Sequence, residues 1–195
     1  MKRIFFLIPL ILGIACNSRY EWVDDLDRSI KAYDKNAQPV EEAYQINSGT
    51  STSIFIEPYQ VRDGIQKTIF RHARTEVMYF ERHIYQQGED IVYEHHVGTA
   101  PRLIKEEGQI VKTSDYMVFN KHSYFKNDKV GKRFGQQKLI DKYVPKDSVP
   151  HAINNLKVEE SYLYHEDYLE IKNYLKDILA LQRVEEWPRA ILWIM

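Results

Sequence analysis

The chain has 195 residues, of which 44% are hydrophobic, and its 27 lysines and arginines nearly balance 28 aspartates and glutamates, for a net charge of −1 at pH 7. This length suits one domain with a substantial core, and the balanced charge gives no reason to expect nucleic acid as a partner. A single cysteine excludes a disulfide within the chain, so stability must come from packing.

The first sixteen residues have the three parts of an export signal. Lys2 and Arg3 precede an apolar run from Ile4 to Ala15, which ends in small residues before Cys16. A basic start, a short apolar core and a small-residue cleavage site are typical of a secretory signal peptide, here residues 1–15. A transmembrane helix is not expected, because crossing a bilayer takes roughly 20 apolar residues.

The end of this segment, Leu12-Gly13-Ile14-Ala15-Cys16, resembles the lipobox of bacterial lipoprotein precursors. The resemblance covers residues 1–16 alone; the usual leucine three residues before the cysteine is Gly13 here, with Leu12 beside it. It implies cleavage before Cys16, a diacylglycerol and an N-acyl chain such as palmitate on that residue, and a membrane-anchored mature protein. Asn17 is not the aspartate that retains enteric lipoproteins at the inner membrane, which implies the outer membrane where the organism has one.

Two other interpretations of the segment stay open. An ordinary signal peptide cut after Ala15 would leave Cys16 as an unpaired thiol on an exported protein, which needs a reason. The run is also compatible with an apolar N-terminal strand of a cytoplasmic protein. Lipidation supplies the reason for the lone cysteine, and two acyl chains hold a protein stably at a membrane where one holds it only marginally.

Residues 16–20 are then a lipidated tether, and residues 21–46 are expected to form a helical segment. Four apolar side chains recur at the spacing of one helix face, namely Trp22, Leu26, Ile30 and Tyr33. The aspartates at its start, Asp24, Asp25 and Asp27, are read as charges that complement the helix dipole, with a cation site as the alternative. Pro39 predicts the first turn of a second short helix running to about Gln45.

After a polar linker from Asn47 to Thr52, residues 53–195 are expected to form an α+β domain. Alternating apolar residues and turn signals predict an antiparallel meander of hairpins. The predicted strands are Ser53–Tyr59, Ile65–Arg71, Glu76–Gln86, Glu89–Val97, Arg102–Lys105, Gln109–Lys112, Asp115–Asn120, Tyr124–Lys126, Lys129–Arg133 and Lys138–Val144.

From about Val158 to Arg183 the apolar residues again recur with a period of 3.6 residues, as in a helix. This predicts a long C-terminal amphipathic helix packed on one face of the sheet. Its apolar stripe is Tyr164, Tyr168, Ile171, Leu175 and Ile178. The tail from Ala190 to Met195 is apolar throughout, and it is read as a last strand, a patch for a partner, or the residue of a truncated reading frame.

A hairpin around Gly88 carries a candidate metal site. If paired residues have numbers that sum to 177, His83 faces Glu94 and Glu81 faces His96, and all four share one face of the sheet. Two histidines and two glutamates are suitable ligands for zinc or another borderline metal. The alternative is ordinary cross-strand packing, and a one-residue slip would send every side chain to the other face.

The segment from Lys121 to Lys142 is basic, with aromatic residues between its charges. Its candidate anion-binding side chains are Lys121, Lys126, Lys129, Lys132, Arg133 and Lys138. Near a membrane such a patch could bind anionic headgroups, an acidic polysaccharide or an envelope protein. The alternative is a set of solvated lysines on an exposed hairpin.

No phosphate-binding, dinucleotide-binding, zinc-helix or serine-hydrolase motif occurs in the sequence. The sequence therefore favours a non-enzymatic binding or scaffolding lipoprotein of the cell envelope. The alternative is a metal-dependent hydrolase that uses the histidine hairpin.

Overall fold

The computed structural model describes residues 20–47, 52–61, 64–106 and 108–181. Cys16, the signal segment and the apolar tail from Ala190 lie outside these residues. The strands are β1 (Gln38–Pro39), β2 (Tyr44–Asn47), β3 (Ser53–Gln60), β4 (Ile65–Arg74), β5 (Met78–Gln87), β6 (Asp90–Glu106), β7 (Gln109–Asn127), β8 (Val130–Ile140) and β9 (Glu159–Leu163). The helices are α1 (Glu21–Asp34), α2 (Val149–Ile153) and α3 (His165–Leu179), and a 3₁₀ turn, η2 (Lys146–Ser148), precedes α2.

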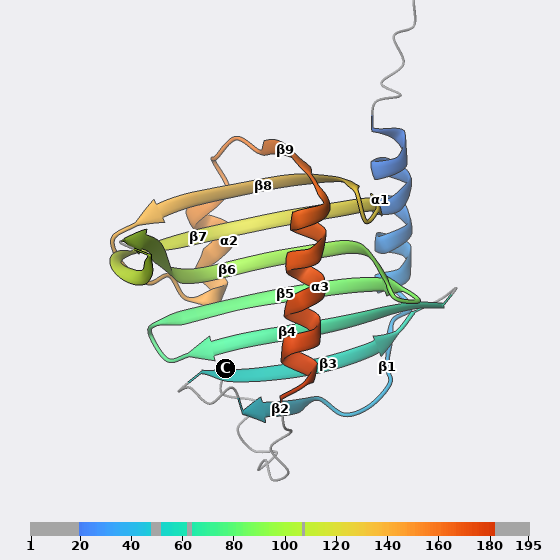
Figure 1. Cartoon of the computed structure of the whole chain (residues 1–195), viewed down its shortest axis with the longest axis horizontal. Helices are drawn as coiled ribbons and strands as arrows, with labels where there is room; N and C mark the ends of the chain where they lie inside the picture. Colours follow the sequence, from blue (N-terminus) through green and yellow to red (C-terminus); the bar gives the residue numbers. More distant parts are fainter. Residues whose placement is uncertain (1–19, 48–51, 62–63, 107, 182–195) are drawn as a thin grey trace, which may run out of the picture.

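All strands belong to one antiparallel sheet in the order β1-β3-β4-β5-β6-β7-β8-β9, and β2 pairs with β3 beside β1 (Figure 1). From β3 to β8 each strand pairs with the next one in the chain, because tight turns and short loops join them. The described part of the chain is therefore an antiparallel sheet with three helices, which agrees with the expected α+β class.

The sheet is covered on both faces, because its strands carry apolar side chains on both sides. α3 crosses the face that we call the front (Figure 1), and its Tyr168, Ile171, Leu175 and Ile178 join a core with sheet residues such as Phe70 and Ile84. α1 packs Val23 and Ile30 against Tyr85, Tyr93 and Tyr124 on the back face. α2 covers a separate apolar cluster around Val118 on that back face.

The helix predicted between Trp22 and Tyr33 is present as α1, and its Asp25, Asp27 and Asp34 bond neighbouring side chains. Asp27 accepts a hydrogen bond of 2.8 Å from Tyr124 Oη and pairs with Lys31, while Asp25 pairs with Arg28. Asp34, at the other end of α1, accepts hydrogen bonds of 2.7 Å from Tyr85 Oη and Lys67 Nζ. The bonds of Asp27 and Asp34 to side chains of the strands hold α1 on the back face of the sheet.

Three predicted elements differ from the structure. The short helix expected from Pro39 is wrong, because residues 38–39 and 44–47 are strands β1 and β2 on the edge of the sheet. Residues 159–163, expected to be helical, form the opposite edge strand β9 before α3 begins at His165. The strands predicted separately between residues 89 and 144 merge into the long strands β6, β7 and β8.

No helix among the residues described is long and apolar enough to cross a bilayer.

Candidate anion-binding pocket

A bulge in the β5–β6 hairpin decides which side chains share a face. Next to the turn, Gln86 pairs with Ile91 and Gln87 with Asp90, as a sum of 177 requires. The register shifts between Tyr85 and Gln86, and beyond the shift the partner numbers sum to 178. A one-residue shift turns every later side chain of β6 to the other face.

The predicted pairings of His83 with Glu94 and of Glu81 with His96 are therefore wrong. His83 pairs with His95 and Glu81 with Val97 on the back face, while Glu94 and His96 lie on the front face opposite Ile84 and Arg82. The four candidate ligands are divided between the two sides of the sheet. Within the described ranges, no group of three or more histidine, cysteine, aspartate or glutamate residues could hold a metal ion.

The two glutamates of the predicted metal cluster, Glu94 and Glu81, bond other side chains instead. Glu94 accepts a 2.5 Å hydrogen bond from Arg82, and both side chains are buried beneath α3, with 2% and 8% of their surfaces exposed. On the back face, burial alone would raise the pKa of Glu81, but hydrogen bonds from His83, Tyr79 and Lys146 outweigh burial and lower it. Glu81 is thus held as a carboxylate by hydrogen-bond donors and a cation, and Glu94 is paired with Arg82.

The same shift creates a row of histidines that the sequence did not indicate. His83, His95 and His122 occupy paired positions on β5, β6 and β7 of the back face, and the rings of His95 and His122 stack at 4.4 Å. His95 bonds Asn120 and His122 bonds Tyr93. Burial, and after it the neighbouring His122, lower the pKa of His95 to about 4, so the His95 ring is uncharged at neutral pH. No signal in the sequence marks a bulge at this place, so the row could not be found from it.

The basic segment is also divided, because its cations alternate along β7 and β8. Lys121 and Arg133 point to the front face, whereas Lys132 and Lys138 point to the back, and Lys126 and Lys129 flank the β7–β8 turn. Lys132 is nearly buried, pairs with Glu160, and lies over the rings of Tyr20 and Tyr162. Of the six predicted cations, Lys121 and Arg133 line a common pocket.

This pocket, here called the cation pocket, has a volume of about 250 Å³ and lies across β7, β8 and β9 on the front face. Its lining residues are Lys121, Arg133, Gly135, Gln137, Glu159, Glu160 and Ser161. Gly135 pairs with Lys121, and a Cβ at Gly135 would come to 3.1 Å from Lys121 Cγ. Because Gly135 has no side chain, there is space beside Lys121 in the pocket.

The two cations of the pocket have weak partners. Arg133 Nε donates to Ser123 Oγ at 3.0 Å, and its nearest carboxylate oxygen, on Asp167, is 3.9 Å away. Lys121 Nζ lies 5.6 Å from the ring centre of Phe119 and makes no ion pair with any residue that the structure describes. Burial, and after it the positive charge of Arg133, lower the pKa of Lys121. An anion between the two side chains would relieve both effects.

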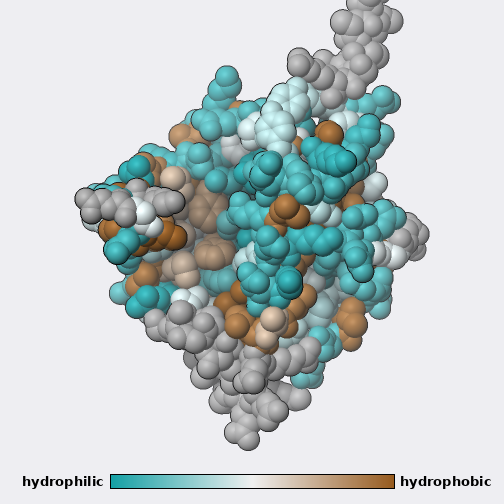
Figure 2. All heavy atoms as spheres, in the orientation of Figure 1, coloured by the Kyte–Doolittle hydropathy of each residue, from teal (hydrophilic) through white to brown (hydrophobic). Residues whose placement is uncertain are grey.

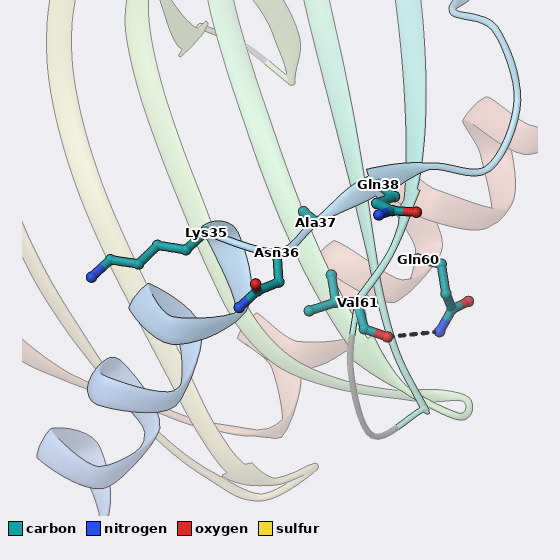
Figure 3. Close-up of a pocket in the computed structure, with 6 residues that line it drawn as sticks. All are labelled: Lys35, Asn36, Ala37, Gln38, Gln60 and Val61. Atoms are coloured by element: carbon teal, nitrogen blue, oxygen red, sulfur yellow. Dashed lines mark hydrogen bonds between the residues drawn. The ribbon is translucent and has the colours of Figure 1, made fainter.

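Two further pockets are weaker candidates for a ligand site than the cation pocket. One, of about 450 Å³, lies where α1 leads into β1, and Figure 3 shows the Lys35 side chain extending away from the other lining residues, Asn36, Ala37, Gln38, Gln60 and Val61. Gln60 Nε2 in this pocket already donates to the carbonyl oxygen of Val61 at 3.0 Å. The other, of about 560 Å³, lies between the β5–β6 turn and α3, with Leu169 and Lys176 on its wall.

Comparison with known proteins gives no independent guide to function: no protein-family model, curated protein or solved structure matches this chain. The residues of the cation pocket and the N-terminal signal are therefore the basis on which function is inferred.

Proposed function

We propose that this protein is a lipid-anchored, non-enzymatic binding protein of the bacterial cell envelope, and that it binds an anionic group in the cation pocket. The observation that carries the proposal is the pair Lys121 and Arg133, which line one pocket and, among the described residues, make no ion pair closer than the 3.9 Å contact of Arg133 with Asp167. A carboxylate or phosphate accepts charge-assisted hydrogen bonds from lysine and arginine. The lipobox-like segment supplies the membrane anchor and the exported address.

The anchor is tested by acylation of Cys16. Cells that express the full chain are grown with radiolabelled palmitate, and the protein is expected to carry the label because its thiol and new amino terminus are acylated. Cys16→Ala should abolish labelling, while the neighbouring Asn17→Ala should retain it. Labelling of the Cys16→Ala protein, or none of the unaltered protein, would rule out the anchor.

The pocket is tested by titrating the full chain, held in phosphatidylcholine nanodiscs, with acetate and with inorganic phosphate in a calorimeter. Lys121→Met or Arg133→Met is expected to weaken binding about tenfold or more, because a hydrogen bond to a charged group contributes roughly 1.5–3 kcal/mol. Lys138→Met is the matched control, because this exposed cation of the same segment lies on the back face. Equal losses in all three variants would point to general charge attraction and contradict a defined pocket.

A further inference from the structure

The cation pocket continues into a strip of rings on the front face. The strip consists of His72 on β4, Phe80 on β5, His96 on β6 and Phe119 on β7. His72 stacks on Phe80 at 4.3 Å, Phe80 meets His96 at 5.4 Å, and His96 meets Phe119 at 4.5 Å. Lys121 of the cation pocket lies next to Phe119, so the aromatic strip and the pocket are contiguous.

The aromatic strip lies beside α3, because His72 Nε2 is 2.6 Å from Tyr174 Oη of that helix. Figure 2 shows an apolar depression between α3 and the projecting end of the β6–β7 hairpin. On the front face of β5, β6 and β7, the side chains of Phe80, His96 and Met117 are half-buried, and Phe119 is buried. Gly98 faces Phe119 across the β6–β7 pair. Because glycine has no side chain, it adds no bulk between the rings of Phe80 and Phe119.

The two histidines of the aromatic strip do not make it charged. Burial, and then the nearby positive charge of Arg82, lower the pKa of His72 to about 4, and the same two causes lower the pKa of His96 well below its usual value. His72 Nε2 lies 2.6 Å from Tyr174 Oη of α3. His96 Nε2 is fully buried and has no hydrogen-bond partner among the residues described. The aromatic strip is thus a neutral, largely apolar surface at neutral pH.

The projecting hairpin adds an apolar lip to the hollow. Val111 of the hairpin and Leu139 of β8 are exposed at positions that alternate to the front face, whereas Leu103 and Ile110, which are 62% and 75% exposed, alternate to the back. Apolar side chains of this size are rarely exposed together without a partner for them. The hollow and its lip therefore offer apolar surface at one end and cations at the other.

The charge of the cation pocket selects among anionic partners. Lys121 and Arg133 are accompanied in the lining by Glu159 and Glu160, and Glu160 is already paired with Lys132. Asp167, 3.9 Å from Arg133, offsets part of the remaining positive charge, so the excess at the pocket is at most one charge. A singly charged group such as a carboxylate matches this excess better than a doubly charged phosphate monoester.

We propose that the cation pocket and the aromatic strip together bind a single-chain amphiphilic carboxylate, a fatty acid. Its carboxylate lies between Lys121 and Arg133, and its hydrocarbon chain lies along Phe119, His96 and Phe80 toward the hairpin lip. This inference rests on the proposed function, because it names the ligand class of the same pocket. Apolar burial should supply most of the affinity, and the cations should fix the orientation.

The test is a chain-length series of acetate, butyrate, hexanoate and octanoate, titrated into the full chain in phosphatidylcholine nanodiscs, with the heat of empty nanodiscs subtracted. Each added methylene is expected to tighten Kd by about two- to fourfold, because each is removed from water. Lys121→Met and Arg133→Met should weaken every member of the series by a similar factor. Met117→Gln, which makes the hollow more polar at nearly constant side-chain size, should reduce the dependence on chain length and leave acetate binding unchanged.

The outcomes separate this inference from the proposed function. If acetate and octanoate bind equally and both require Lys121, the fatty-acid inference is wrong and the cation pocket stands. If octanoate binds tightly but equally well to the Lys121→Met and Arg133→Met proteins, the chain binds elsewhere and both proposals fail. If no carboxylate or phosphate binds, the pocket itself is rejected. The series with unaltered protein decides the matter even where a variant fails to fold.

Discussion

Replacing Glu94 by alanine is expected to lower the free energy of unfolding by about 3–5 kcal/mol, because it leaves the guanidinium of Arg82 buried without its counter-charge. Both side chains lie between α3 and the sheet, where water does not reach them. Arg82 also lies 4.1 Å from the ring centre of Tyr174 on α3. Arg82→Ala should cost a similar amount for the reciprocal reason. Urea unfolding followed by circular dichroism measures both effects.

A double substitution tests whether the loss comes from the isolated charge. Arg82→Met with Glu94→Leu removes both charges and keeps much of the apolar volume, so it should recover a large part of the stability lost in either single variant. Arg28→Ala, which breaks an exposed pair with Asp25, should cost less than about 1 kcal/mol. Single variants as stable as the unaltered protein would show that this ion pair does not hold α3 on the sheet.

Gly98→Ala is expected to destabilise the protein by about 3 kcal/mol. Gly98 has a φ of 151°, and a Cβ on it would lie well under 3 Å from the carbonyl oxygen of Tyr79 and from Cα of Phe80. These are backbone atoms of β5, so the collision can be relieved only by separating β5 from β6. Overpacking of this kind typically costs about 1–3 kcal/mol, and backbone strain adds about 1–3 kcal/mol.

Gly88→Ala is the matched control for this prediction. Gly88 also has a positive φ, of 62°, but a Cβ there meets nothing within 4 Å. Its replacement should cost only about 1 kcal/mol, from the backbone conformation alone. The two midpoints of thermal unfolding, compared directly, separate collision from strain. If Gly98→Ala and Gly88→Ala lower the midpoint of unfolding by the same amount, the close approach of β5 and β6 at Gly98 has no energetic consequence.

Local periodicity was sufficient to predict some elements. The repeat through Trp22, Ile30 and Tyr33 predicts α1, and the alternation around Gly88 predicts the β5–β6 hairpin, because both patterns arise within one element or one turn. Pro39 was misread, because proline is acceptable both in the first turn of a helix and on an edge strand. Only the pairing of residues 38–39 with β3 decides between them.

The candidate site could be predicted only in part, because it depends on register. The basic segment contained Lys121 and Arg133, but their common face follows from the pairing of β7 with β8. The bulge at Tyr85 and Gln86 moved Glu94 and His96 away from His83. Such a bulge bends and twists its strand, and no local pattern in the sequence marks where this one occurs. His72 and Phe119 come together from strands that are distant in sequence, so neither carried a signal.

The two edges of the sheet have a consequence for crowding at a membrane surface. One edge is divided between β1 and β2 and contains Pro39, which has no N–H to offer, and the other is the five-residue β9, which carries Glu159 and Glu160. Short, charged or proline-containing edges disfavour the addition of a strand from another molecule. If the chain is anchored as proposed, copies concentrated in two dimensions would meet frequently, and these edges should keep such encounters from growing into aggregates.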